Sequence, residues 1–490
     1  MDLLQFIDTN LFHFQTTSWQ EIFMFLLNSI YWITLVGVIL VVILDNRNPV
    51  KTISWVLVLI FLPYVGLFLY IFFGQRYRKQ KIISKKSIRS IENNPAYLYE
   101  ELNPAQYPNE CVELIGLLRK NNFHPVFSGN DVRLFTSGKE KFNALLDDIS
   151  KARKHIHLDY YIFGDSKIGY ELQNLLIQKA KEGIEVRVIY DDFGSWKTKN
   201  RFFREMTDAG VQVMPFLKVR LPWLSTKTNL RNHRKIAVID GEIGYTGGMN
   251  IADRYIDGGN FKFWRDSHVR IKGKGAYGLQ TAFLIDWFFV SRQLLTSKFY
   301  FPDIINMGTS LVQIATSSPD TDWEGIMQGI FCMISKAKKY VYLQTPYFLP
   351  NEGLLTALQI AALSGVDVRL MVPANSDTHI TTKAMHSYLA EVMEAGVKVY
   401  FFEKGFLHAK TVVADDVVST VGSTNLDYRS FNDNFEVNAF IYDKDFAVRM
   451  KEVFIRDQED CLFLDLETWE KRSKFKRLTE SVCRIFGPML

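Results

Sequence analysis

The chain has few cysteines, little net charge and no low-complexity stretch, and each absence removes a class of protein. Its 490 residues include four scattered cysteines, with no CxxC pair among them. This spacing argues against a disulfide framework and against a cysteine zinc site, and it suits a reducing compartment. A net charge of +5 is too small for a charged nucleic-acid-binding tail, and 29 Gly with 14 Pro exclude collagen-like sequence.

Charge is also missing from two long apolar stretches near the N-terminus, at residues 22–44 and 53–73. Each is long enough to cross about 30 Å of hydrocarbon as a helix, and buried core helices rarely lack charge for so long. Seven Lys and Arg follow the second stretch, against two in the turn between the stretches, which places the later part in the cytoplasm. We therefore expect a membrane anchor at 1–75 with two transmembrane helices, then a basic cytoplasmic linker at 76–107.

The remaining chain alternates strand-like and helical patterns, and it resembles itself. The segments 151–158, 183–188 and 209–213 match 336–343, 365–370 and 395–399, at offsets of 185, 182 and 186. A period of this size means two copies of a domain rather than a solenoid. The sequence thus predicts two related α/β lobes, 108–305 and 306–490, that form a pseudo-dimer with its site at the seam. Basic and apolar residues mix after residue 469, which favours an amphipathic C-terminal tail.

Each lobe carries one copy of an HxKxxxxD motif. The first copy contains His233, Lys235 and Asp240, and the second contains His408, Lys410 and Asp415. In both lobes an Asn, Asn250 or Asn425, follows the His by 17 residues after a Gly-containing turn. A single HxK is often a solvated strand face, but two copies with equal downstream spacing indicate a site.

The chemistry of these residues suits an anion. On a strand, residues i and i+2 share a face, so the His and Lys of each motif point together. Asp240 and Asp415 are part of the motif, yet on a regular strand they fall on the opposite face and look structural. The two Asn residues are candidates for phosphate binding, because backbone N–H groups in such turns approach phosphate oxygens. We expect a phosphoryl-transfer site without metal or cofactor, because the two lysines supply the positive charge.

The paired motifs resemble those of the phospholipase D superfamily. The two apolar stretches, residues 45–52, Gln344–Pro350 and Gly422–Ser430 are similar to bacterial cardiolipin synthases over essentially the whole chain. The resemblance implies a phosphatidyltransferase of the bacterial cell membrane, multi-pass, with its lobes in the cytoplasm. It also implies that two phosphatidylglycerols become cardiolipin and glycerol through a phosphatidyl-histidine. In such enzymes the first motif usually attacks, which would make His233 the nucleophile and His408 the general acid.

Two further acids follow the motifs, Asp266 in the first lobe and Glu436 in the second. In this superfamily such carboxylates bond the Nδ1 atom of the histidine across the seam. The resemblance therefore implies that Asp266 orients His408 and that Glu436 orients His233. An ordinary exposed acid on a loop is the alternative for each.

Two other functions remain open at this point. A hydrolase of the phospholipase D type would use the same motif with water as the acceptor. A non-catalytic scaffold that binds anionic lipid would need the basic surface but not the histidines. The apolar stretches favour a lipid substrate over nucleic acid, so we expect phosphatidylglycerol and anionic lipids as partners. The sequence does not determine the oligomeric state.

Overall fold

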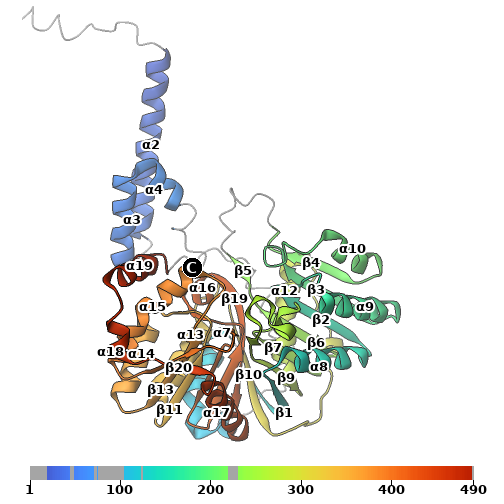
Figure 1. Ribbon diagram of the computed structural model, residues 1–490. Coiled ribbons are helices and arrows are strands. Elements are labelled where there is room, and N and C mark those ends of the chain that lie inside the picture. The colour runs from blue at the N-terminus through green and yellow to red at the C-terminus, as the bar shows by residue number, and fades with distance from the viewer. Residues whose placement is uncertain are drawn as a thin grey trace, which may run out of the picture. The chain divides into compact units, whose positions relative to one another are not determined.

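Figure 1 shows a computed structural model of the chain. It describes residues 19–44, 49–70, 74, 104–122, 125–218 and 230–487. The N-terminal helices form one compact unit, and the rest of the described chain forms a second. Most of the expected basic linker, at 76–103, lies outside the described residues.

The two apolar stretches fold differently. The first forms one helix, α2 (Trp19–Leu44), and among the described residues it contains the one helix long and apolar enough to cross a membrane, at Ile22–Leu44. The second is divided between α3 (Pro49–Phe61) and α4 (Pro63–Leu69), and residues 71–73 lie outside the described part. Pro63 causes the break, because proline disfavours a helical conformation in the preceding residue, and Leu62 has φ −126° and ψ 64°. Within residues 49–70, which contain the described part of the second stretch, no single helix is long enough to span a membrane.

The second unit confirms the α/β fold with two related lobes. Seven strands of the first lobe follow the order β1-β9-β7-β6-β2-β3-β4, and the second lobe has the matching order β10-β19-β17-β16-β11-β13-β14, extended by β20. The strands of the first lobe are β1 (Val126–Phe135), β2 (His155–Tyr160), β3 (Glu185–Asp191), β4 (Gln212–Phe216), β6 (Lys235–Ile239), β7 (Ile243–Gly247) and β9 (His268–Lys272). Those of the second are β10 (Ser310–Ser317), β11 (Tyr340–Gln344), β13 (Asp367–Pro373), β14 (Lys398–Phe402), β16 (Thr411–Ala414), β17 (Val418–Gly422), β19 (Asn434–Tyr442) and β20 (Cys461–Phe463). Antiparallel pairing of β1 with β10 joins the two lobes edge to edge (Figure 1).

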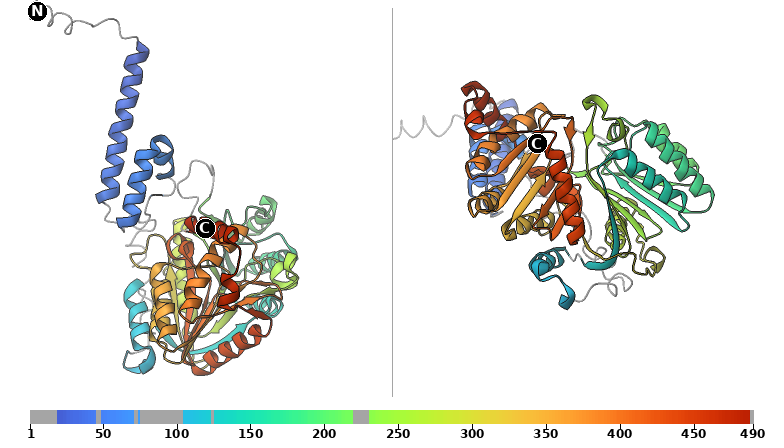
Figure 2. Two further views of the ribbon diagram at one scale, coloured as in Figure 1. Left: turned by 60° about the vertical axis from the view of Figure 1, so that its left-hand side comes forward. Right: turned by 60° about the horizontal axis from the view of Figure 1, so that its bottom comes forward.

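Helices cover both faces of the sheet (Figure 2). In the first lobe α8 (Gly138–Ser150), α9 (Lys167–Lys181) and α10 (Asn200–Asp208) enclose an apolar core on one face. In the second lobe α13 (Gly325–Lys336), α14 (Glu352–Leu363) and α15 (His379–Glu394) do the same. The opposite face is covered by α12 (Ala276–Ser291) and α17 (Lys444–Gln458). The helix α7 (Val112–Asn122), at the start of the expected first lobe, packs into the core of the second lobe through Leu114 and Leu118.

The aspartates of the two motifs hold turns at the end of the sheet remote from their histidines. Asp240 follows β6 and accepts hydrogen bonds from the backbone N–H groups of Arg153, Lys154 and His155, at 2.7–3.2 Å. Asp415 follows β16 and accepts the equivalent three bonds from residues 338–340, at 2.7–2.9 Å. Both have φ 55°, a left-handed conformation that Asp adopts more readily than most residues. They are positioning residues that join the start of β2 or β11 to the end of the motif strand.

We predict that Asp240→Ala destabilises the protein without removing a reacting group. Loss of a charged acceptor for three N–H groups should lower the free energy of unfolding by about 3 kcal/mol, seen as a lower thermal unfolding midpoint in detergent. The control Asp147→Ala removes only an exposed ion pair with Lys151, which should cost about 0.5 kcal/mol or less. Lost activity with an unchanged midpoint would instead indicate a catalytic role for Asp240.

Candidate active site

The site lies where each lobe extends a short strand into the other. The strand β5 (Arg231–Asn232) leaves the first lobe and pairs in parallel with the start of β19. The pairing continues one residue further, where the N–H of His233 donates to the carbonyl of Phe435 at 2.9 Å. This brings the His233 ring beside the next residue of β19, Glu436, with Nδ1 at 3.0 and 3.1 Å from the two carboxylate oxygens.

The second lobe makes the reciprocal contact. There β15 (Phe406–Leu407) pairs with β8 (Trp264–Arg265) of the first lobe, and the N–H of His408 donates to the carbonyl of Arg265 at 2.7 Å. The His408 Nδ1 atom lies 2.7 Å from Asp266 Oδ2. The expected contacts of both acids across the seam are therefore present. A carboxylate on Nδ1 holds the tautomer in which Nε2 is free to react.

The two carboxylates have different surroundings. Glu436 accepts hydrogen bonds from the Ser423 hydroxyl and, at 3.1 Å, from the Asn434 carboxamide. Burial raises the pKa of Glu436, but His233, Lys235 and Ser423 outweigh this effect and the net pKa lies below its usual range. Asp266 accepts from the Ser267 N–H at 2.7 Å, and burial raises its pKa to about 6.

Both motif lysines are buried and point into the same region. The Lys235 ammonium donates a hydrogen bond to the carbonyl of His233. The Lys410 ammonium donates to the carbonyl of His408, at 2.5 Å. Each ammonium has further N–H groups that can bind an anion. Burial lowers the pKa of Lys235 to about 7 and that of Lys410 to about 8. Burial lowers the pKa of both imidazoles, that of His233 to about 4, and the lysine of the opposite lobe adds to this effect, Lys410 at His233 and Lys235 at His408. A phosphodiester anion would add negative charge to that of the two carboxylates and would stabilise the charged form of both lysines.

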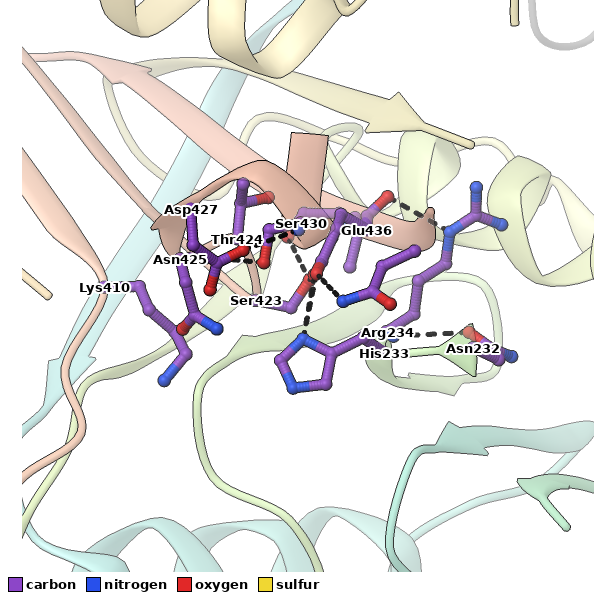
Figure 3. A network of polar contacts seen from close by, with 12 residues as sticks. Asn232, His233, Arg234, Lys410, Ser423, Thr424, Asn425, Asp427, Ser430 and Glu436 are labelled. Atoms are coloured by element: carbon purple, nitrogen blue, oxygen red, sulfur yellow. Dashed lines mark hydrogen bonds and ion pairs between the residues drawn. The ribbon is translucent and has the colours of Figure 1, made fainter. Parts of the chain in front are cut away.

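The two asparagine side chains differ in how many of their polar atoms have hydrogen-bond partners. Asn425 is buried beside Lys410, and its carboxamide points into the same space as the Lys410 ammonium (Figure 3). Its Oδ1 atom has no hydrogen-bond partner among the described residues. Asn250 accepts from the Ile162 N–H at 3.1 Å and donates to the Tyr255 hydroxyl at 2.6 Å. Phosphate binding by both stays a prediction, and Asn425 has the freer polar atom.

Sequence reasoning missed several side chains around the histidines. The Tyr161 ring contacts His233 with centroids 5.0 Å apart, and the rings of Trp264 and Tyr255 lie 5.5 and 6.0 Å from His408. Asp377 acts on the His408 side, where it raises the pKa of that imidazole against the larger lowering effect of burial, and it accepts from the Tyr347 hydroxyl at 2.6 Å. Tyr347 lies within Gln344–Pro350, so its segment could have been selected, whereas no motif marks Asp377.

Within the described ranges, no three His, Cys, Asp or Glu side chains are grouped as a metal site would require.

Comparisons with known proteins agree with this geometry. A family model described as cardiolipin synthase, PLD-like domain matches twice, at residues 145–274 and 330–458. A model described as phospholipase D-nuclease N-terminal matches residues 30–75. The chain is 40% identical over 466 residues to a cardiolipin synthase of Geobacillus sp. (strain WCH70), covering 93% of this chain and 92% of that protein. It is 41% identical over 460 residues to a cardiolipin synthase of Listeria monocytogenes serotype 4b (strain F2365), covering 92% and 95%.

A solved structure supports the fold independently. The phosphatidylserine synthase of Haemophilus influenzae Rd KW20 superposes with a TM-score of 0.57 at 14% identity, covering 77% of this chain and 98% of that one. The two copies of the domain model fall one on each lobe, and each contains one complete HxKxxxxD motif. The chain therefore belongs to the cardiolipin synthase family, whose catalytic domains are phospholipase D-like.

Proposed function

We propose that the chain transfers a phosphatidyl group from one phosphatidylglycerol to another, giving cardiolipin and free glycerol. The observation that carries the proposal is the seam itself, where two histidines, each bonded through Nδ1 to a carboxylate of the other lobe, lie among two buried lysines. Two imidazoles of this kind provide a nucleophile and an acid, and the lysines balance the phosphate charge. Family membership supports the lipid substrate.

The reaction proceeds in two displacements. The Nε2 atom of His233 attacks phosphorus, the bond from phosphorus to the glycerol oxygen breaks, and His408 protonates the departing oxygen. His408 then removes the proton from a hydroxyl of the second phosphatidylglycerol, whose oxygen attacks the phosphatidyl-histidine and releases His233. The overall exchange consumes no water and needs no redox partner.

The unequal surroundings of the two histidines support this division of roles. Glu436 has a lowered pKa and stays ionised, so it stabilises the positive charge that develops on His233 when Nε2 bonds to phosphorus. Asp266 has a pKa raised to about 6, and Asp377 adds negative charge on the same side. Burial lowers the pKa of His408 well below its usual range, and the contact with Asp266 and the negative charge of Asp377 oppose this effect, as an acid that must carry a proton requires.

Purified protein with phosphatidylglycerol vesicles should form cardiolipin and glycerol in equal amounts. Lys235→Ala and Lys410→Ala should each lower the rate by about 100-fold or more, because one buried charge that faces the transition state is lost. The exposed residue Lys151 gives the matched control, and Lys151→Ala should keep full activity. Phosphatidic acid as the main product would show that water is the acceptor, and the proposed transfer reaction would then be wrong.

Covalent trapping should separate the two histidines. With His408→Ala, lipid should still attach slowly to the protein, above all from a substrate with a good leaving group, because the attacking imidazole is intact. With His233→Ala no adduct should form, as measured by mass spectrometry of the peptides. An adduct on His408 in the His233→Ala protein would reverse the roles, and no adduct in any variant would favour direct displacement.

We also propose a multi-pass anchor with the lobes on the cytoplasmic side. The Lys and Arg excess after the second apolar stretch supports the side. The α2 helix provides one crossing. The α3 and α4 helices together would provide the other, since membrane helices tolerate a break at proline when neighbouring groups satisfy the freed backbone atoms.

Cysteine labelling in intact cells tests this topology. An impermeant thiol reagent should modify a cysteine placed at Asn48, which the two crossings leave outside, and should not modify one placed at Ser90. The four native cysteines would be replaced by alanine, and both sites should react after the cells are opened. Protection of position 48 with exposure of a cysteine at Thr16 would mean that α3 and α4 enter and leave the membrane on one side.

A further inference from the structure

The last helix, α19 (Lys474–Ile485), packs on the protein through its polar face. Its buried residue is Glu480, which is 2% exposed and accepts hydrogen bonds from the Arg472 guanidinium at 2.8 and 2.9 Å. Near the end of the helix, the Arg484 guanidinium lies 3.9 Å from the centre of the Tyr388 ring of α15 and pairs with Glu391. A surface helix normally buries an apolar stripe, so this arrangement is inverted.

The apolar side chains of α19 point outward as a consequence. Phe475, Leu478, Val482 and Ile485 are 76%, 61%, 47% and 74% exposed, and Phe486 directly after the helix is 49% exposed. Their spacing of three or four residues places them in one stripe opposite Glu480. Four exposed cations accompany the stripe, Lys471, Lys474, Lys476 and Arg477. An apolar stripe beside Lys and Arg is the composition of helices that lie in the interface of an anionic bilayer.

The helix α19 lies at the same edge of this unit as the short strand that delivers His233 (Figure 1). Figure 1 shows α19 and α16 (Tyr428–Asn432) at the upper edge of the second lobe, with α16 between α19 and β5. Tyr428 begins α16 three residues after Asn425, and burial raises the pKa of this tyrosine while Arg484 of α19 opposes that effect. The helix therefore lies close to the second-lobe side of the seam.

The first lobe has a smaller apolar feature beside its own motif. Phe193 and Trp196, in the loop after β3, are 46% and 71% exposed. The guanidinium of Arg231, in β5, lies 4.2 Å from the centre of the Phe193 ring, so this loop adjoins the strand that delivers His233. Exposed Lys197 and Lys199 supply positive charge here too.

We propose that α19 and the loop of Phe193 and Trp196 form a docking surface that seats the seam on an anionic lipid bilayer. Each of the two parts carries exposed apolar side chains and cations. The helix α19 belongs to the second lobe and the loop of Phe193 and Trp196 to the first, so the motif strands lie between them. Docking would present the site to lipid headgroups while their acyl chains stay in the bilayer. The inference rests on the surface itself and goes beyond the proposed reaction, so either can fail without the other.

Fluorescence of the full chain in nanodiscs containing phosphatidylglycerol tests the docking directly. An environment-sensitive dye would be attached to Phe475→Cys or Ile485→Cys after Cys332, Cys461 and Cys483 are replaced by alanine, with the buried Cys111 retained. Emission from both positions should shift to the blue and be quenched by spin-labelled lipid. Lys151→Cys, at the opposite end of the strands, should do neither. Equal, unquenched emission at all three positions would overturn the proposal. A blue shift in detergent that grows with protein concentration would also overturn it, because it would mean that a second copy of the chain covers this surface.

A catalytic comparison gives an independent readout. The double variant Phe475→Ser with Ile485→Ser should lower activity on bilayer phosphatidylglycerol by about 100-fold or more, because each large apolar side chain contributes about a factor of ten or more to membrane binding. Activity on a short-chain, monomeric phosphatidylglycerol should be retained. Ile360→Ser with Leu363→Ser removes two similarly exposed side chains, 58% and 73%, from the remote end of α14 and should leave both activities unchanged. Equal losses on the two substrates in the α19 variant would contradict docking.

Discussion

The reciprocal crossing of β5 and β15 is the constraint on which the site depends. Each is only two residues long, yet each places the backbone of a motif histidine on a strand of the other lobe. Without these pairings neither histidine would meet its carboxylate, since Glu436 and Asp266 belong to the opposite lobes. The pairing of β1 with β10 fixes the position of one lobe relative to the other. The short pairings of β5 and β15 then fix where the two imidazole rings lie.

Burial gives the site its electrostatic character. Lys235 is fully buried and Lys410 nearly so, and the low polarity of their surroundings opposes their charge in the absence of an anion. The same burial excludes water and strengthens every interaction with a bound phosphodiester. Asp240 and Asp415 contribute from the far end of the motif strands, because they fix where those strands end.

The repeated motif was enough to predict from sequence that the two histidines and two lysines come together, because equal spacing in two copies implies equal geometry. Asp266 and Glu436 could be matched to their histidines only through the family resemblance, since no spacing rule states that a contact crosses between lobes. Asp377 was not predicted, because it lies in the loop before α15 and belongs to neither copy of the motif. The packing of α7 in the second lobe was equally hidden, because it follows from the β1 and β10 junction rather than from any local pattern.

Fusion of the two lobes in one chain has a consequence at the position of Gly248 and Ser423. A side chain at Gly248 would place its Cβ atom 2.0 Å from Asp266 Oδ1, so a serine does not fit there. At the equivalent position of the second lobe, Ser423 donates its hydroxyl to Glu436. A true homodimer would have to carry the same residue twice and could satisfy only one of these needs. When one chain contains both halves, each half can acquire its own substitutions. The two histidines of a nearly symmetric fold can then have different surroundings.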